Sequence, residues 1–507
     1  MPTFDLREEP WIPVVCQDGK TEEVGLRRAL VEAHLFVEIS DPIPIVEFGL
    51  YRLLVALVMD VFELRGIRGL LSLLEAGRFD PNQVDSYLER WGDRFDLFHA
   101  QYPFLQTSSS GGKTKPLAAL LPAIPSGTNA LHFHRHTEDE FAACPAAAAR
   151  LLATIAPFMT AGGTGLSPSI NGAPPWYVMP RGGALFETVC LNCCVLPLPG
   201  DRKDAPPAWR DPRPASPGRR AGASLLEALS WRPRQVRLIP SDAGICSLTG
   251  RESSVLVCTM HFSPGASSGF LWTDPNVPYR ITSEKVTPLR PKEGRELWRD
   301  TGPISLLQDK DYESHHGRGI VRFNRPVIMT QFAHMASTGL LPCRPKLDLV
   351  AYGMRTDLNM KVFEWQREAL AVPVPLLSRS SLCAEAQRAS EQAEAVASAI
   401  AQCARAVYPR GGADNRAGFG RRIAAAHRRY WADLRSDFET LLWALAALPV
   451  HASIDEAQPC LRHWRDRLWQ VGMAALEQAI GDLDTDAALL ARQVHARSDF
   501  QVAFPGC

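Results

Sequence analysis

Gly162, Gly163, Thr164 and Gly165 form the first candidate for a binding surface, directly after a stretch with helical periodicity. Glycine has no Cβ, so this backbone can adopt conformations closed to other residues and can bring its N–H groups against a flat or anionic ligand. No lysine of a P-loop lies nearby, and no dinucleotide-binding unit follows. From this pattern alone a nucleotide phosphate, a nucleic-acid groove and a tight turn stay open as interpretations, and the turn is favoured.

A histidine cluster is the second candidate. His132, His134 and His136 alternate, so on a β-strand they would share one face, as metal ligands can, and Glu138 and Asp139 follow as possible bases. Such a set would suit a metal-dependent hydrolase. The favoured interpretation is an exposed polar loop, in which the acidic residues lie at the N-terminus of the next helix and stabilise its dipole.

The cysteines indicate a core role. Cys190 and Cys193 form the only C-x-x-C pair, and Cys194 adjoins them. A structural zinc site would need a second pair of ligands at suitable spacing. The surrounding residues 186–196 predict an apolar helix, where cysteine packs as a small hydrophobic residue. We therefore expect no metal and no cofactor.

Composition narrows the class of protein. The chain has 507 residues, enough for two or more domains, and its 55 basic and 55 acidic side chains give a formal net charge of zero. A protein that holds nucleic acid alone carries a basic excess, so a role of that kind must be local or shared with basic partners. No apolar run long enough to span a membrane and no signal peptide is recognisable, which predicts a cytoplasmic location.

The order of segments predicts an α+β fold, with an irregular mixed α/β N-terminal domain over residues 1–375 and a C-terminal four-helix bundle over residues 376–507. In the first part we expect a helix over residues 45–75, a loop over 107–115, a flexible Pro/Arg-rich surface segment over 200–223 and a β-rich region from 231 to 374. In the second part alanine-rich helical segments alternate with short connections, as in antiparallel bundles. Two core stripes are expected there: Leu434, Phe438, Leu441, Leu442 and Leu445, and then Leu461, Trp464, Leu468, Val471 and Ala475.

Several motifs occur in a fixed order across most of the chain. They are EPWIPV at 9–14, YPFLQT at 102–107, GTN at 127–129, LSWRPRQVRL at 229–238, and DPNVPYR at 274–280, which leads to PLRP at 288–291 and LWRD at 297–300. In this order, ahead of a helical bundle, they resemble the CasA family, the large subunit of the type I-E CRISPR surveillance complex (Cascade).

The resemblance implies a subunit without catalytic activity. In that family the subunit contacts the short motif that flanks the target (the PAM) as duplex from the minor groove, helps to open the DNA into an R-loop, and recruits the helicase-nuclease. The implied partners are the other Cascade subunits, CRISPR RNA, PAM-bearing double-stranded DNA and the helicase-nuclease effector. A minor groove offers few base-specific patterns, which suits contact by shape and close backbone approach.

The family's contact elements map onto this sequence unevenly. The glycine loop corresponds to Gly162, Gly163, Thr164 and Gly165. The lysine-bearing β-hairpin should lie within residues 255–272, where the expected tip, residues 260–265, has no lysine and His261 stands in. The family's glutamine wedge falls in residues 355–360, which contain no glutamine. The remaining assignments are Arg355, Thr356, Leu358 and Asn359 to the wedge, and Phe133 with His134 to the loop that touches the guide RNA.

Overall fold

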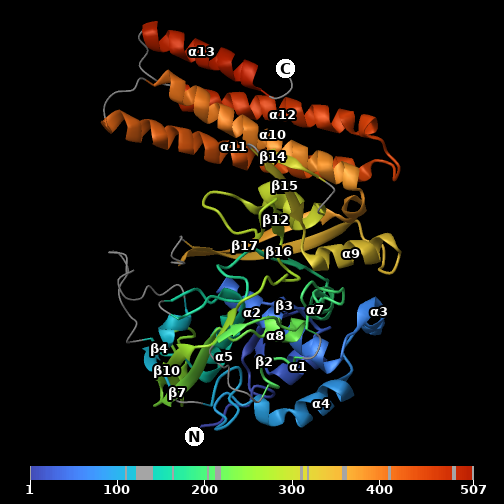
Figure 1. Cartoon of the computed structure of the whole chain (residues 1–507), viewed down its shortest axis with the longest axis vertical. Coiled ribbons are helices and arrows are strands. Elements are labelled where there is room, and N and C mark those ends of the chain that lie inside the picture. Colours follow the sequence, from blue (N-terminus) through green and yellow to red (C-terminus); the bar gives the residue numbers. More distant parts are fainter. Residues whose placement is uncertain are drawn as a thin grey trace.

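The computed structural model describes residues 2–108, 111–121, 141–162, 165–202, 205–211, 218–308, 312–316, 319–356, 362–408, 413–481 and 487–504. Figure 1 shows three layers along the longest axis: helices and small sheets at the N-terminal end, a long ribbon of β16 (Lys346–Thr356) and β17 (Val362–Pro373) beside α9 (Val327–Ser337) in the middle, and long helices at the C-terminal end. This mixed architecture confirms the predicted α+β fold.

Helix α2 (Pro44–Val61) is the centre of the N-terminal layer. Every side chain from Ile45 to Asp60 is buried, as expected of a helix that is largely apolar, and the charged Glu47, Arg52 and Asp60 are buried with the rest. The prediction of one continuous helix to residue 75 is wrong, because α2 ends at Val61 and a new helix begins at Gly66. Glu63 and Gly66 have φ angles of 45° and 70°, and left-handed residues cannot continue a right-handed helix.

Short helices surround α2 and several pack directly against it, as Figure 1 shows. In chain order the helices of this region are α1 (Leu26–Val31), α3 (Gly66–Ala76), α4 (Pro81–Arg90), η1 (Gly92–Arg94), η2 (Leu117–Leu120), α5 (Pro145–Ala153), α6 (Ile155–Phe158), α7 (Leu185–Leu191) and α8 (Leu225–Leu229). Three further short helices contact the β16–β17 ribbon or the C-terminal helices: η5 (Leu297–Asp300), η6 (Gly302–Leu306) and η8 (Val374–Ser378).

The strands form small separate sheets. Two of them bear on the candidate site: β4–β10–β7 and β17–β16–β5, both antiparallel throughout. The remaining strands are joined in the orders β2–β1–β3, β11–β6, β13–β12–β15–β14 and β8–β9. The bounds are β1 (Ile12–Cys16), β2 (Thr21–Val24), β3 (Phe36–Ile39), β4 (Lys113–Pro116), β5 (Tyr177–Pro180), β6 (Gly218–Arg220), β7 (Arg234–Ser241), β8 (Gly244–Ile245), β9 (Glu252–Ser253), β10 (Leu256–Pro264), β11 (Ala266–Ser268), β12 (Tyr279–Ile281), β13 (Val286–Pro288), β14 (Ser314–His316) and β15 (Gly319–Asn324).

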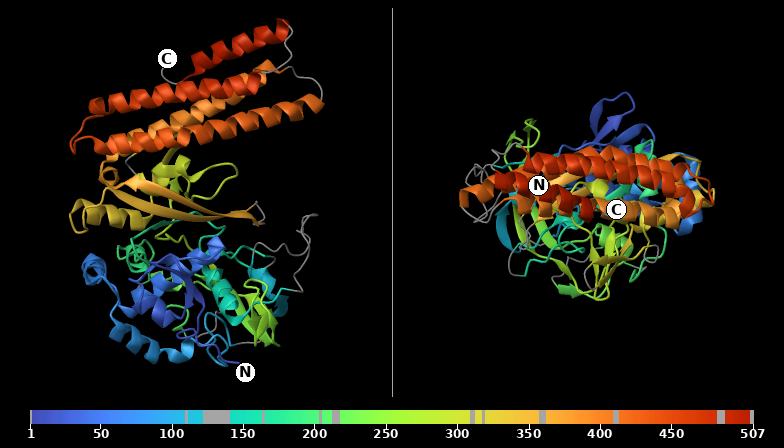
Figure 2. Two further views of the ribbon diagram at one scale, coloured as in Figure 1. Left: turned by 180° about the vertical axis from the view of Figure 1, so that it is seen from behind. Right: turned by 90° about the horizontal axis from the view of Figure 1, so that it is seen from above.

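The C-terminal layer consists of α10 (Ser380–Val407), α11 (Ala413–Ala447), α12 (Ile454–Ile480) and α13 (Ala487–Ala503), which lie across the end of the molecule (Figure 2). A capping box formed by Ser453 and Glu456 fixes the start of α12. Both predicted core stripes are confirmed: Leu461 is partly buried against the core and the other nine side chains are buried.

The bundle is joined to the middle layer through η5. The Trp298 ring lies 5.8 Å from that of Trp431 and 5.3 Å from that of Phe438, both on α11. The guanidinium of Arg299 lies 3.6 Å from the Trp431 ring centroid and also pairs with Glu394 on α10 at 2.8 Å. Edge-on and tilted aromatic contacts, a cation–π contact and an ion pair therefore hold the bundle against the rest of the chain.

The structure also corrects two predicted loops. Residues 107–115 were expected to be a loop, but Lys113 begins β4. The segment 200–223 was expected to be a flexible surface, yet Trp209 is 3% exposed and donates a hydrogen bond to the Tyr87 hydroxyl at 2.8 Å. Burial of this aromatic side chain packs the described residues 205–211 against the core.

The prediction of core cysteines is confirmed for Cys190, Cys193 and Cys194, which are at most 2% exposed. Burial raises the pKa of the Cys193 thiol well above its usual value, which keeps it neutral. Across the described ranges, no three His, Cys, Asp or Glu side chains are grouped as a metal site would need, and no helix is both long and apolar enough to cross a membrane.

Candidate nucleic-acid interface

The glycine loop begins after the short helix α6 and returns to it. The backbone N–H of Ser169 donates to the carbonyl of Met159 at 2.7 Å, which closes the base of the loop. Gly165 has a φ angle of 79°, a left-handed conformation that favours glycine. Among the described residues, a Cβ added to Gly162 would meet Leu166 and Arg234 at 3.6 and 3.9 Å, which is ordinary van der Waals contact, so this side of Gly162 packs against the protein. Gly163 and Thr164 lie outside the described residues.

A buried polar network supports the C-terminal stem of the loop. The amide of Asn171 donates to Asp274 at 2.9 Å and to the Tyr177 hydroxyl at 3.1 Å. Asp274 in turn pairs with Arg52 of α2 at 2.8 Å, and these two side chains are 0% and 2% exposed. The loop is thereby tied to the central buried helix of the N-terminal layer.

Arg234 of β7 spans the same loop from the opposite side. It donates to the carbonyl of Thr160 at 2.7 Å and to the carbonyl of Ser167. Its guanidinium also lies 5.6 Å from the ring centroid of Phe262 on β10. The glycine loop and the sheet β4–β10–β7 are therefore in direct contact.

His261 is in this sheet, but the prediction that residues 260–265 form a hairpin tip is wrong. Met260 and Phe262 are buried and His261 pairs with Thr114 on β4 and Arg237 on β7, so the segment is the interior of a strand. The alternation of half-buried Thr259, His261 and Ser263 with buried Met260 and Phe262 is that of a strand within a sheet. The Nδ1 atom of His261 is buried, and no hydrogen-bond partner for it is found in the described parts of the chain.

Lys113 and Lys115 are the cations that sequence reasoning missed. They lie on β4 opposite Phe262 and Met260, and the Lys115 ammonium is 4.7 Å from the Phe262 ring centroid. None of the residues of β4, β10 and β7 is acidic, although the chain as a whole has no net charge. The alternation of Lys113, Thr114 and Lys115 was the available signal, but four residues are too few to distinguish a strand from a loop.

The β16–β17 ribbon carries the remaining described candidates. Arg355 pairs with Glu364 across the ribbon at 2.8 Å and with Glu293 at 3.4 Å, and Thr356 faces Val362 in the register. These contacts brace the ribbon next to its tip. Leu358 and Asn359, which follow Thr356 in the sequence, lie outside the described residues, as do His132, Phe133, His134, His136, Glu138 and Asp139.

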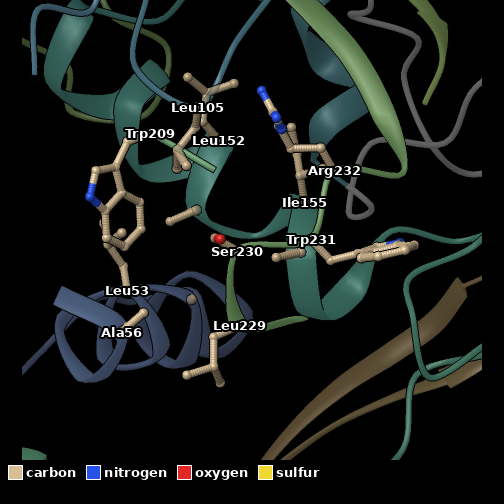
Figure 3. A pocket seen from close by; sticks show the side chains of 13 residues that line it. Leu53, Ala56, Leu105, Leu152, Ile155, Trp209, Leu229, Ser230, Trp231 and Arg232 are labelled. Atoms are coloured by element: carbon tan, nitrogen blue, oxygen red, sulfur yellow. The ribbon is translucent and has the colours of Figure 1, made fainter. Parts of the chain in front are cut away.

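A pocket between α2, α5 and the segment around Trp231 has a different character. Figure 3 shows Leu53, Leu152, Ile155 and Trp209 around it, and its volume is about 20 Å³. That is room for about one water molecule. We interpret this pocket as a small packing defect in the core and not as a substrate site.

Together these features define a class: a large mixed α/β protein with a C-terminal helical bundle and a glycine loop beside a basic sheet. The model of the family "CRISPR-associated protein Cse1" matches residues 5–475, and the chain belongs to this family, also called CasA. A curated relative from Thermus thermophilus, described as CRISPR-associated protein CasA/Cse1, is 33% identical over 316 residues, which spans 59% of each chain. The chain thus aligns with somewhat less than two thirds of that relative's length.

Solved structures agree on the fold. Cse1 from Acidimicrobium ferrooxidans matches with a TM-score of 0.76 and 22% identity over 99% of this chain and 98% of that one. Thermus thermophilus CasA matches with a TM-score of 0.71 and 24% identity over 99% and 100%. A chain of a structure described as a CRISPR RNA-guided surveillance complex matches with a TM-score of 0.73 and 21% identity over 99% and 100%.

Proposed function

We propose that this chain is the large subunit of a type I-E CRISPR RNA-guided surveillance complex and has no catalytic activity of its own. The observation that carries this proposal is the family match over residues 5–475, supported by the fold shared with a surveillance-complex chain. The proposed partners are the other Cascade subunits, CRISPR RNA, PAM-bearing duplex DNA and a helicase-nuclease that the subunit recruits. The proposed location is the cytoplasm.

We propose that the two parts of the chain have different roles. Residues 1–375 would carry the DNA contacts and residues 376–507 the helical bundle, with η8 leading directly into α10 at the proposed boundary. Gly162, Gly163, Thr164 and Gly165 would lie against the minor groove of the PAM duplex, where close backbone approach substitutes for a base-specific code. Phe133 and His134 would contact the guide RNA or an adjacent subunit.

The tip of the β16–β17 ribbon is the proposed wedge. Leu358 and Asn359 would enter the duplex next to the PAM, with Arg355 and Thr356 at the base of the wedge. The ion pairs of Arg355 would keep the ribbon rigid while the wedge separates the bases. Unstacking a base step costs a few kcal/mol, while guide–target pairing is nearly balanced against the DNA duplex. A small local contribution can therefore decide the rate of opening.

This function is tested by permanganate footprinting of a PAM-bearing duplex with the complex assembled with the chain, without it, and with the double variant L358A/N359A. We expect opening to require the chain and to be about 10-fold slower with the variant, which corresponds to about 1.4 kcal/mol. PAM encounter, followed by gel shift, should be unchanged in the variant.

The matched control is Leu340→Ala, which truncates a leucine that is 45% exposed. Opening that proceeds normally without the chain contradicts the proposed function. Opening at the normal rate with L358A/N359A contradicts only the wedge assignment.

We also assign Lys113, Lys115 and His261 to the backbone of the bound duplex. Each lysine–phosphate contact steepens the dependence of log Kobs on log salt by about 0.9. The variant K113Q/K115Q should therefore lower the slope by about 1.8, with PAM preference unchanged, as measured by titrations between 50 and 200 mM salt, roughly the range in which such contacts dominate.

The control for this prediction is K20Q/K285Q, which removes two exposed lysines from hairpin connections outside the sheet. An unchanged slope for K113Q/K115Q, or an equal decrease for both double variants, would exclude the sheet as a phosphate-contacting surface.

A further inference from the structure

Arg234 is a buried cation under the glycine loop. It is 2% exposed, and its Nη2 donates to the carbonyl of Thr160 at 2.7 Å while Nη1 donates to the carbonyls of Ser167 and Pro233, the latter at 2.9 Å. Among the described residues no carboxylate lies within ion-pair distance of it. Its charge is therefore compensated by backbone carbonyls, two of which belong to the loop.

A buried charge without a carboxylate partner is costly unless its donors are satisfied. The two Nη groups of Arg234 are hydrogen-bonded, whereas no partner for its buried Nε is found among the described residues. Burial lowers the pKa of Arg234 to about 10, so the guanidinium is still protonated near neutral pH. The carbonyls of Thr160 and Ser167 must stay in place to stabilise it. For the same reason, the guanidinium holds these two carbonyls at a fixed separation.

The two loop carbonyls that Arg234 binds lie on opposite sides of the glycines in the sequence. Thr160 precedes the glycines and Ser167 follows them, so one planar fork bridges the two stems of the loop. Five N–H groups in a rigid arrangement make arginine suited to this, whereas a lysine ammonium is a single point donor on a flexible stem. Gly162 lies directly over the fork, since its Cβ would be 3.9 Å from Nη2.

The other side of Arg234 faces the basic sheet. Its guanidinium packs on Phe262, and the chain at Gly265 approaches so closely that a Cβ there would lie 2.7 Å from the backbone nitrogen of Arg234. Arg234 thus fixes the loop relative to the sheet in which β4 carries Lys113 and Lys115.

We infer that Arg234 is the positioning residue of the glycine loop, which presets the width of the loop and its placement beside the basic sheet for contact with duplex DNA. The inference rests on the proposed function of that loop. Arg234 touches no DNA in this arrangement and acts through the two stem carbonyls. Its loss should therefore affect recognition of closed PAM duplex more than any step after opening.

The test is Arg234→Lys in the assembled complex, with Arg325→Lys as the matched control. Arg325 is also buried, at 7% exposure, and donates to the carbonyls of Ser305 and Leu377 at 3.2 and 2.9 Å, away from the loop. We expect R234K to weaken binding of closed PAM duplex about 10-fold and to leave binding of a pre-opened bubble target within about 2-fold, which assumes that one of the loop hydrogen bonds is lost. R325K should leave both unchanged.

An equal loss of affinity for both targets would show that Arg234 has only a general structural role and would contradict the inference. No loss of affinity for either target would also contradict it. A parallel measurement with Gly163→Asp distinguishes failure of the proposed role of the loop from failure of the role of Arg234. If that variant also binds PAM duplex normally, the proposed role of the loop fails; if it loses binding while R234K does not, only the role of Arg234 fails.

Hydrogen exchange on the isolated chain provides a second measurement, which decides the case if R234K does not assemble. Amides of the loop between Thr160 and Ser169 should exchange at least about 10-fold faster in R234K than in the unaltered chain. The reason is that local opening of the loop no longer requires the Arg234 hydrogen bonds between the two stems to be broken. The amides of α2 and of the bundle should be unchanged. Unchanged protection of the loop would overturn the inference.

Discussion

Replacement of Gly163 by aspartate is expected to lower the affinity of the assembled complex for PAM-bearing duplex about 100-fold, or about 2.7 kcal/mol. The loop is proposed to lie against the minor groove through its backbone, so a side chain would hold the DNA away. A carboxylate also adds repulsion by the phosphates, and unfavourable charge juxtaposition at an interface costs several kcal/mol. Gel shifts with PAM-bearing and PAM-mutated duplexes measure the effect.

Two further variants make this result interpretable. Gly69→Asp places the same carboxylate at a half-buried helical glycine with open space where its Cβ would lie, and should bind normally. Gly162→Ala adds a single methyl whose contacts with the described residues are ordinary ones, at 3.6 and 3.9 Å, so it should fold normally and lose an intermediate amount of affinity. Full affinity of the Gly163 variant for PAM duplex would remove the loop from the proposed interface.

The second large effect concerns stability. Arg52→Met is expected to lower the free energy of unfolding of the N-terminal layer by about 3–5 kcal/mol, because Asp274 would remain buried without its partner. Asp274 is fully buried, lies 2.8 Å from the Arg52 guanidinium and also holds Asn171. Denaturant titrations followed by tryptophan fluorescence provide the measurement.

The comparison variants separate burial from charge. R52M/D274N removes both charges and should recover part of the loss, as buried pairs replaced together are far less destabilising than broken ones. Arg28→Met breaks an exposed pair with Glu22, in which the two side chains are 44% and 35% exposed, and should cost at most about 1 kcal/mol. An equal loss from Arg28→Met and Arg52→Met would contradict this account.

Much of the fold could be predicted because its signals are local. The stripes through Leu434 and Trp464 repeat at helical spacing, and burial follows from that period. The turn at Glu63 and Gly66 could not be predicted, since apolar periodicity continues through it. The short strand at Lys113 was missed for a related reason: it is a strand only because β10 pairs with it.

The candidate site divides in the same way. The sequence by itself determined the family, through motifs in a fixed order. It also determined the presence of a glycine-rich loop, because the backbone freedom of glycine follows from its lack of a Cβ. Only the tertiary structure decided that Arg234 bridges Thr160 and Ser167, and that Lys113 belongs to the sheet that contacts this loop. Arg234 is 74 residues from Thr160, and contacts over such separations depend on how layers pack and leave no periodic pattern in the chain.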